Sequence, residues 1–426
     1  MKQLDAKTSE TYVQILKEEL LPAMGCTEPI AVAYCAAKAR AVLGTMPERV
    51  LIEASGNIIK NVKSVIVPNT AGMKGIQAAA AAGIVAGRED LVLEVISQVT
   101  SKQRKEIADY LEKTSIVLHP MEDCDKLDVI VTVYAGDEYA RVRISHMHSN
   151  ISLIEKNGEV LYEQGKCECS DEEPCADRST LTVAKIVQFA DTTDLEPVKE
   201  VLDRQIEYNM AISEEGLKNS WGANVGSIIL KCGSNSVRNY AKAMAAAGSD
   251  ARMSGCELPV VINSGSGNQG ITVSVPVIVY AEAQHCSKEE LYRALLVSNL
   301  ISVHIKAGIG ALSAFCGAVS AGCAAGCGIA YLQGGREDAI AHTLVNAIAI
   351  VSGIVCDGAK PSCAAKIASS LDAAFLGYDM YLNNEQFYGG DGIISKGVEN
   401  TIRNIGRLGA DGMYGTDKEI IRIMTD

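Results

Sequence analysis

The strongest constraint on the fold is an uncharged run, AGIGALSAFCGAVSAGCAAGCGIA, at residues 307–330. The run is long enough to cross a bilayer. However, it consists mainly of Ala, Gly, Ser and Cys, which pack closely against other helices and have little affinity for lipid. We therefore expect one buried central helix in a helical bundle and no membrane partner.

The composition agrees with a large, closely packed core. The chain has 426 residues, of which 48% are hydrophobic and only 5% aromatic. Small and β-branched residues must therefore fill the interior. A chain of this length has room for about two or three domains.

The charge excludes one class of partner. The net charge is −13, and no block of Lys and Arg appears, whereas a nucleic-acid partner needs a basic face. The N-terminal stretch MKQLDAKTSETYVQILKEELLPAM is polar and amphipathic and has no apolar signal core. We therefore expect no nucleic-acid partner and a cytoplasmic location.

Residue patterns predict an α+β fold with two parts. Alternating residues over 115–162 indicate antiparallel strands and hairpins, and residues 48–67 read as two strands around a Ser-Gly-Asn turn. Helical patterns dominate before this region and after residue 179, and the last of them lies near 395–407. We expect a mostly helical domain of residues 1–45 and 179–426, which would bind the cofactor and carry catalysis. A smaller α/β domain with an antiparallel sheet would span 46–178.

Cysteine is unusually frequent, with fourteen residues. In a reducing compartment such thiols indicate metal binding or catalysis more than disulfides. The loop CECSDEEPC holds Cys167, Cys169 and Cys175, and we favour an exposed loop over a zinc site there because no fourth ligand follows nearby.

Three further cysteines, Cys316, Cys323 and Cys327, fall on one face of the expected central helix. Each also suits simple core packing, because free Cys buries readily.

The segment GIVCDGAKPSC differs, because Gly and Pro surround Cys356 and Cys363. Its backbone freedom would allow both thiols to turn toward one point. Together with one helix thiol they would supply three ligands. A cubane iron–sulfur cluster normally takes four thiolates, so three would leave one iron open.

The turn MGCTEP places Cys26 just before an expected helix. Free N–H groups and the positive end of the helix dipole should lower the pKa of that thiol and hold a carboxylate. Thr27 would donate to a substrate carboxylate, and Glu28 would take the α-ammonium group. The alternative is that Thr27 is only an N-cap and Glu28 only a first-turn charge.

Two other motifs hold candidate functional residues. NSGSGNQG, at 263–270, lies between two apolar runs but lacks the Lys of a phosphate-binding P-loop; the alternative is a plain hairpin turn. His146 and His148 point the same way if their segment is a strand. For these two we favour a surface pair over a role in proton transfer.

The stretches LLPAMGCTEPIAVA, VVINSGSGNQGI and VCDGAKPSC resemble the L-cysteine desulfidase family, which is related to the α-chain of bacterial iron–sulfur L-serine dehydratases. The resemblance implies a [4Fe–4S] cluster on Cys316, Cys356 and Cys363, and no pyridoxal phosphate. It implies that Cys26 transfers a proton or acts as a removable fourth ligand. It further implies substrate contacts, which are Ser264, Gly265, Asn268 and Gln269.

The activity that the resemblance implies is an α,β-elimination. L-cysteine would yield pyruvate, ammonia and hydrogen sulfide, with the open iron as Lewis acid. The alternatives are an L-serine dehydratase with the same cluster, a non-enzymatic iron–sulfur sensor and a zinc-bound structural protein. The expected partner is a small amino acid. The sequence does not decide between a monomer and a homo-oligomer.

Overall fold

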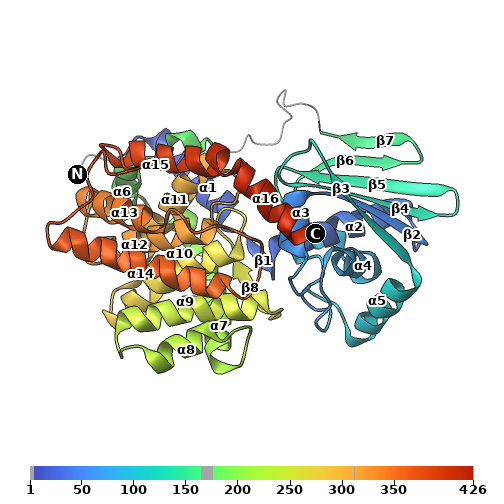
Figure 1. Ribbon diagram of the computed structural model, residues 1–426, viewed down its shortest axis with the longest axis horizontal. Coiled ribbons are helices and arrows are strands. Elements are labelled where there is room, and N and C mark those ends of the chain that lie inside the picture. The colour runs from blue at the N-terminus through green and yellow to red at the C-terminus, as the bar shows by residue number, and fades with distance from the viewer. Residues whose placement is uncertain (1–3, 165–175, 311, 426) are drawn as a thin grey trace.

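The computed structural model describes residues 4–164, 176–310 and 312–425. It shows a large helical part beside a smaller part built on a six-stranded sheet (Figure 1). The fold is α+β and mostly helical, which confirms the expected class.

The larger sheet has the strand order β3-β2-β4-β5-β6-β7. The pair β2 and β3 is parallel, and the other neighbours are antiparallel. The strands are β2 (Arg49–Ser55), β3 (Ser115–Met121), β4 (Asp128–Ala135), β5 (Glu138–Ser145), β6 (Ile151–Lys156) and β7 (Glu159–Glu163). The expected strands over 115–162 are therefore present.

One face of this sheet is covered by helices. On β4 the alternate residues Val129, Val131 and Val133 are fully buried, as the two-residue period of a strand requires. The covering helix α2 (Thr27–Leu43) packs on β4 and β5, and α4 (Ile76–Ala86) packs on α2. A Cβ at Gly83 of α4 would lie 2.0 Å from the carbonyl oxygen of Ala33, so these two helices touch backbone to backbone.

The first two helices lie in different parts of the molecule. Helix α1 (Ala6–Glu19) packs against the helical part, whereas α2 lies on the sheet. The sheet part also includes η1 (Glu89–Glu94) and α5 (Ser101–Lys113). The division of the chain into domains stays a prediction.

The helical part surrounds α12 (Gly317–Leu332), which packs against α10, α11, α13 and α14. Most of α12 is buried, because its Gly, Ala and Ser side chains let neighbouring helices approach closely. The other helices are α6 (Val183–Thr192), α7 (Lys199–Lys218), α8 (Val225–Cys232), α9 (Val237–Met253), α10 (Gly267–Ala283), α11 (Lys288–Ile309), α13 (Glu337–Val351), α14 (Cys363–Leu382) and α15 (Val398–Arg407), with the short turns η2 (Arg178–Thr180), η3 (Glu196–Val198) and η4 (Leu408–Gly412).

The uncharged run is not one helix, contrary to our expectation. Helix α11 ends at Ile309, where Gly310 adopts a φ of 88°, and α12 begins only at Gly317. The left-handed glycine ends the helix, and Cys316 lies in the break. Across the described residues, none of the helices combines the length and apolarity that a membrane crossing requires.

One other local prediction was wrong. The second strand expected within 48–67 is α3 (Gly56–Val62), because the Ser55 hydroxyl accepts a bond from the Ile58 amide (3.3 Å) and caps a helix there. The alternative of a plain hairpin turn at NSGSGNQG is also excluded, because the apolar run after residue 266 is helix α10.

A two-stranded sheet connects distant parts of the sequence. Strand β1 (Pro22–Met24) pairs antiparallel with β8 (Pro259–Val261), with Pro22 opposite Val261. The turn that begins α2 and the glycine loop that begins α10 directly follow these two strands. The pairing therefore brings the two motifs side by side.

The C-terminal helix α16 (Tyr414–Thr425), which we did not expect, crosses to the sheet part and packs on α3 (Figure 1). Its Asp417 forms a buried ion pair with Lys60 (2.5 Å) and accepts a hydrogen bond from Asn57 Nδ2 (2.8 Å). The side chains of Lys60 and Asp417 are only 1% and 8% exposed. This contact joins the end of the chain to the sheet part.

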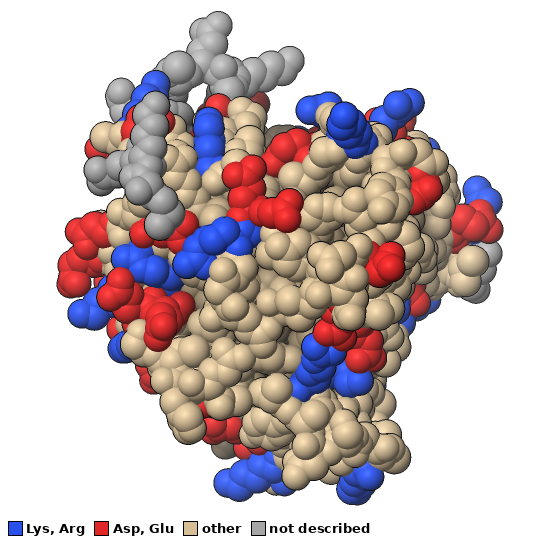
Figure 2. Space-filling view, turned by 90° about the vertical axis from the view of Figure 1, so that its left-hand side faces the viewer, with Lys and Arg blue, Asp and Glu red and all other residues tan. Residues whose placement is uncertain are grey.

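Charges on the helical part are mixed. Figure 2 shows Lys and Arg interspersed with Asp and Glu on the face in view, around a broad central area of uncharged residues. A mixed surface of this kind mainly promotes solubility.

Replacing Asp417 by Ala should destabilise the fold by about 3–5 kcal/mol, because it leaves a buried Lys60 ammonium group without its partner. Urea unfolding followed by circular dichroism measures this change. The double variant Lys60→Met/Asp417→Leu should recover most of the stability, because it leaves no buried charge unpaired. Wild-type stability in the single variant would show that this pair contributes nothing.

Candidate functional site

The thiols of the sequence motifs meet in a cavity of about 560 Å³ between the helical part and the sheet part. Its wall comes from the start of α2, the loop before α10, the break before α12, the loop before α14 and the segment after β5. The described lining holds the expected site residues Cys26, Glu28, Ser264, Gly265, Asn268, Gln269, Cys316, Cys356 and Cys363. It does not hold Thr27, which is 1% exposed and whose hydroxyl is bonded to the protein, so the expected bond from Thr27 to a substrate carboxylate has no support here. The functions of these residues stay predictions.

Four helices, α2, α10, α12 and α14, begin at this cavity. Their N-cap residues are Cys26, Ser266, Cys316 and Ser362, and among the described residues none of these side chains caps its helix. The first-turn N–H groups therefore have no capping side chain, and the positive ends of four helix dipoles converge. Such an arrangement favours anionic groups in the cavity.

Cys316 and Cys356 lie on two short antiparallel segments. The Cys316 amide donates to the Ile354 carbonyl (3.3 Å), and the Cys356 amide donates to the Ala314 carbonyl (2.7 Å). Between these bonds Phe315 pairs with Val355. Side chains alternate along such segments, so both thiols project to the same side as diagonal neighbours, about 7 Å apart in such a ladder.

Cys363 is the first residue of α14, and its thiol lies 3.8 Å from the Gly358 carbonyl oxygen. The loop before it is held by Asp357, which pairs with Lys360 and with Lys366 (2.5 Å). Gly358 has a φ of +94°, and a Cβ there would lie 2.5 Å from the Lys60 carbonyl oxygen. The loop is therefore fitted closely against α3.

The remaining candidate thiols do not line the cavity. Cys323 and Cys327 are fully buried inside α12, and the Cys327 thiol lies 3.7 Å from the Ile340 carbonyl oxygen. Cys167, Cys169 and Cys175 lie outside the described residues. The structure thus places Cys316, and not its two neighbours on α12, beside Cys356 and Cys363.

The three cavity thiols fit a cluster better than a single ion. Within the described part of the chain, no group of three or more His, Cys, Asp or Glu side chains is placed to hold one metal ion. A tetrahedral zinc site would need sulfur atoms roughly 4 Å apart. Three thiols from different segments around one cavity are a donor set that suits a larger iron–sulfur cluster.

The Cys26 thiol is not acidic, contrary to our expectation. Burial raises the pKa of Cys26 to about 12, with only partial opposition from the Arg252 charge. Burial, followed by the neighbouring Cys356 and Cys363, likewise raises the pKa of Cys316 to about 12. Desolvation of the thiolate outweighs the helix dipole. Cys26 therefore carries a proton at neutral pH.

The turn and the glycine loop are bonded to each other. The Thr27 hydroxyl donates to the Gly265 carbonyl (2.9 Å). Thr27 is the first residue of α2, and Cys26 is its N-cap, so the alternative in which Thr27 is the N-cap is wrong. Glu28 lines the cavity, with one oxygen 4.0 Å from His148 Nε2.

Three buried polar atoms in the cavity have no hydrogen-bond partner among the described residues. They are the amide oxygens Asn268 Oδ1 and Gln269 Oε1, which are acceptors, and the ring nitrogen His148 Nε2. An unpaired buried polar atom is costly, so these atoms mark where a polar ligand would bind. The favoured surface pair of His146 and His148 is wrong, because His148 is 11% exposed and His146 is 67% exposed.

Sequence reasoning missed two basic residues in the cavity wall, Arg252 on α9 and Lys306 on α11, which are 3% and 6% exposed. Burial lowers the pKa of Lys306 to about 8, although Cys356 and Cys316 oppose this shift. The only available signal was a basic residue within otherwise small or apolar sequence, in GSDARMSG and SVHIKAG.

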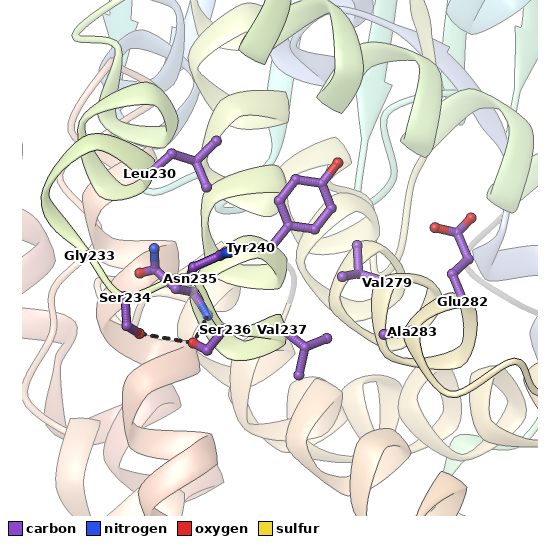
Figure 3. A pocket seen from close by; sticks show the side chains of 11 residues that line it. Leu230, Gly233, Ser234, Asn235, Ser236, Val237, Tyr240, Val279, Glu282 and Ala283 are labelled. Carbon is purple, nitrogen blue, oxygen red and sulfur yellow. Dashed lines mark hydrogen bonds between the residues drawn. The ribbon is translucent and has the colours of Figure 1, made fainter.

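A second cavity, of about 590 Å³, lies between α8, α9 and α10 (Figure 3). Three of the polar side chains in its wall bond to one another or to the backbone. The Ser234 and Ser236 hydroxyls are 3.0 Å apart, and Asn239 donates to the Ile229 carbonyl (3.1 Å). Its lining includes no Cys or His, so the thiol cavity is the better candidate site.

Comparison with known proteins places the chain in a family. The model of the serine dehydratase alpha chain family matches residues 90–422, a range that holds the glycine loop and all three cavity thiols but not the Cys26 turn. A UPF0597 protein of Desulfitobacterium hafniense is 59% identical over 97% of this chain and 96% of its own length. UPF0597 proteins of Lachnoclostridium phytofermentans and Treponema denticola are 49% and 47% identical, over 97% and 99% of this chain and 98% and 99% of their own lengths.

Replacing Gly358 by Ala should destabilise the fold by about 2 kcal/mol and expose Cys363, because the new Cβ would collide with the Lys60 carbonyl. Urea unfolding and the alkylation rate of Cys363, followed by peptide mass spectrometry, measure both effects. Gly353 in the same segment has open space around it, so Gly353→Ala is the matched control. Equal behaviour of the two variants would contradict the close fit of this loop.

Proposed function

Because this chain belongs to the serine dehydratase alpha chain family, we propose that it is an L-cysteine desulfidase. It would eliminate sulfide from L-cysteine with the help of a [4Fe–4S] cluster. The family supports a lyase-type role and iron–sulfur chemistry. The choice of cysteine as substrate is our proposal.

The observation that carries the proposal is the convergence of Cys316, Cys356 and Cys363 on one cavity that also holds unpaired polar groups. These three thiols would hold the cluster. When bound by three thiolates, the cluster supplies one open iron that acts as a Lewis acid toward the leaving group. The remaining chemistry falls to the side chains around it.

The wall near Cys26 favours sulfur as the leaving atom. Cys26 packs with Val65 and with Met253, whose sulfur lies 3.9 Å from Sγ, and Cys363 packs against the same cluster. Cys26 and Cys363 line the cavity, and Met253 lies behind them, where it accepts a bond from Asn268 Nδ2 (3.5 Å). This concentration of polarizable sulfur suits a thiol leaving group.

The reaction breaks two bonds of L-cysteine. A base takes the α-proton, the electron pair of the Cα–H bond forms the Cα–Cβ double bond, and the Cβ–S bond breaks, so that the thiol leaves as hydrosulfide and 2-aminoacrylate remains. The 2-aminoacrylate tautomerises to an imine, which water hydrolyses to pyruvate and ammonia. Cys26 keeps its proton at neutral pH and packs with Met253 and Cys363, so its Sγ–H would donate a hydrogen bond to the departing sulfur.

An L-serine dehydratase is the second candidate, because the matching family carries that name. The Cys26 turn lies outside the residues that match the family model. The two candidates therefore differ in the chemistry of that turn and of the wall beside it. They share the cluster-binding thiols.

An anaerobic assay of the reconstituted protein decides between these functions. We expect sulfide from L-cysteine with a kcat/KM at least tenfold above that for pyruvate from L-serine. Faster turnover of serine would identify a dehydratase. Full iron content with no turnover of either amino acid would overturn the enzymatic proposal and favour a sensor.

Replacing Cys316, Cys356 or Cys363 by Ser should each remove most of the iron and the visible absorbance of the cluster, since a ligand is lost. Elimination activity should fall at least 100-fold. Cys323→Ala serves as control, because Cys323 is buried inside α12 away from the cavity, and it should keep its iron. Full iron occupancy in Cys356→Ser would refute the assignment of that ligand.

A further inference from the structure

We propose that Arg252 binds the α-carboxylate of the substrate and restricts the site to amino acids whose carboxylate is free. This inference rests on the proposed function, because it assumes that the thiol cavity takes an α-amino acid. It concerns a residue on α9 that lies outside the thiol segments and outside both motifs.

The guanidinium group of Arg252 is buried but incompletely paired. The residue is 3% exposed and lines the cavity. Its Nε donates to the Gly25 carbonyl (2.9 Å). Among the described residues, no carboxylate forms an ion pair with it. A buried charge without a counter-ion is costly, so the terminal nitrogen atoms are suited to an anionic ligand.

Arg252 lies next to other hydrogen-bond donors, the N–H groups at the start of α10. The group lies directly against Gly267, the first residue of α10, where a Cβ would be 2.3 Å from Nε and 2.8 Å from Cζ. Only glycine permits this approach. The guanidinium group therefore sits beside the uncapped N–H groups of α10. A carboxylate between them would receive bidentate bonds from arginine and bonds from the helix N-terminus.

Acceptor atoms in the same cavity complement these donors. Asn268 Oδ1 and Gln269 Oε1 are buried and unpaired among the described residues, and the Glu28 carboxylate lines the same cavity. An ammonium group has three N–H donors and no acceptor. The cavity thus offers a donor region for a carboxylate and an acceptor region for an ammonium group, as an amino-acid zwitterion requires.

The test compares L-alanine with L-alaninamide as ligands of the reconstituted protein. Neither has a β leaving group, so binding can be measured by calorimetry without turnover. Wild-type protein should bind L-alanine at least 100-fold more tightly than the amide. In Arg252→Lys, the affinity for L-alanine should fall about tenfold or more, because lysine cannot form the bidentate pair. The affinity for the amide should hardly change.

Arg178→Lys is the matched control. Arg178 also lines the cavity, but it pairs with Glu18 (2.6 Å) and Glu19 (2.8 Å). A lysine can keep one of these pairs, so the preference for L-alanine should stay at the wild-type level. A tenfold loss of that preference in the control would show that the effect at Arg252 is not specific.

Equal binding of L-alanine and the amide by wild-type protein would overturn the inference, even if Arg252→Lys failed to fold. An unchanged preference in folded Arg252→Lys would overturn it as well. The outcome is separable from the proposed function. If L-alanine binds through Arg252 but neither cysteine nor serine is turned over, the carboxylate site stands and the desulfidase proposal fails.

Discussion

The short pairing of β1 with β8 is the contact on which the site depends. It joins residues 22–24 to residues 259–261, and the bond from Thr27 to Gly265 continues it across 238 positions of sequence. Arg252 extends the same connection through the Gly25 carbonyl. Without this pairing the turn before α2 would have no fixed relation to the start of α10, and the donor and acceptor regions of the cavity would not face one ligand.

The small-residue composition explains how so many helix ends reach one cavity. A Cβ at Gly270 would lie 1.9 Å from the Val261 carbonyl oxygen, and one at Gly322 would lie 2.1 Å from the Ser370 hydroxyl. These contacts are shorter than larger side chains allow. Because α10, α12 and their neighbours approach so closely, their N-termini can crowd around a space that suits an amino acid. Larger aliphatic residues would have held the helices apart.

The sequence predicted the elements whose signals are local. The burial of α12 follows from its composition. The Gly and Pro around Cys356 and Cys363 indicated a loop whose backbone lets both thiols turn toward one point. The start of α10 and the burial of His148 were not predictable, because they depend on contacts with distant residues. The helix at 56–62 had a local signal, the Ser55 cap, which we read as part of a turn. The pKa of Cys26 was predicted in the wrong direction. The helix dipole is visible in sequence, but the desolvation that outweighs it depends on Val65 and Met253, which are distant in the chain.

The docking of α16 has a consequence for biosynthesis. Lys60, whose carbonyl supports the loop at Gly358, has Asp417 as its ion-pair partner among the described residues. Cys316, Cys356 and Cys363 are synthesised before Asp417, so the loop that carries Cys363 is made before the residue that neutralises its support. The wall behind these thiols therefore reaches its final packing only after α16 has docked.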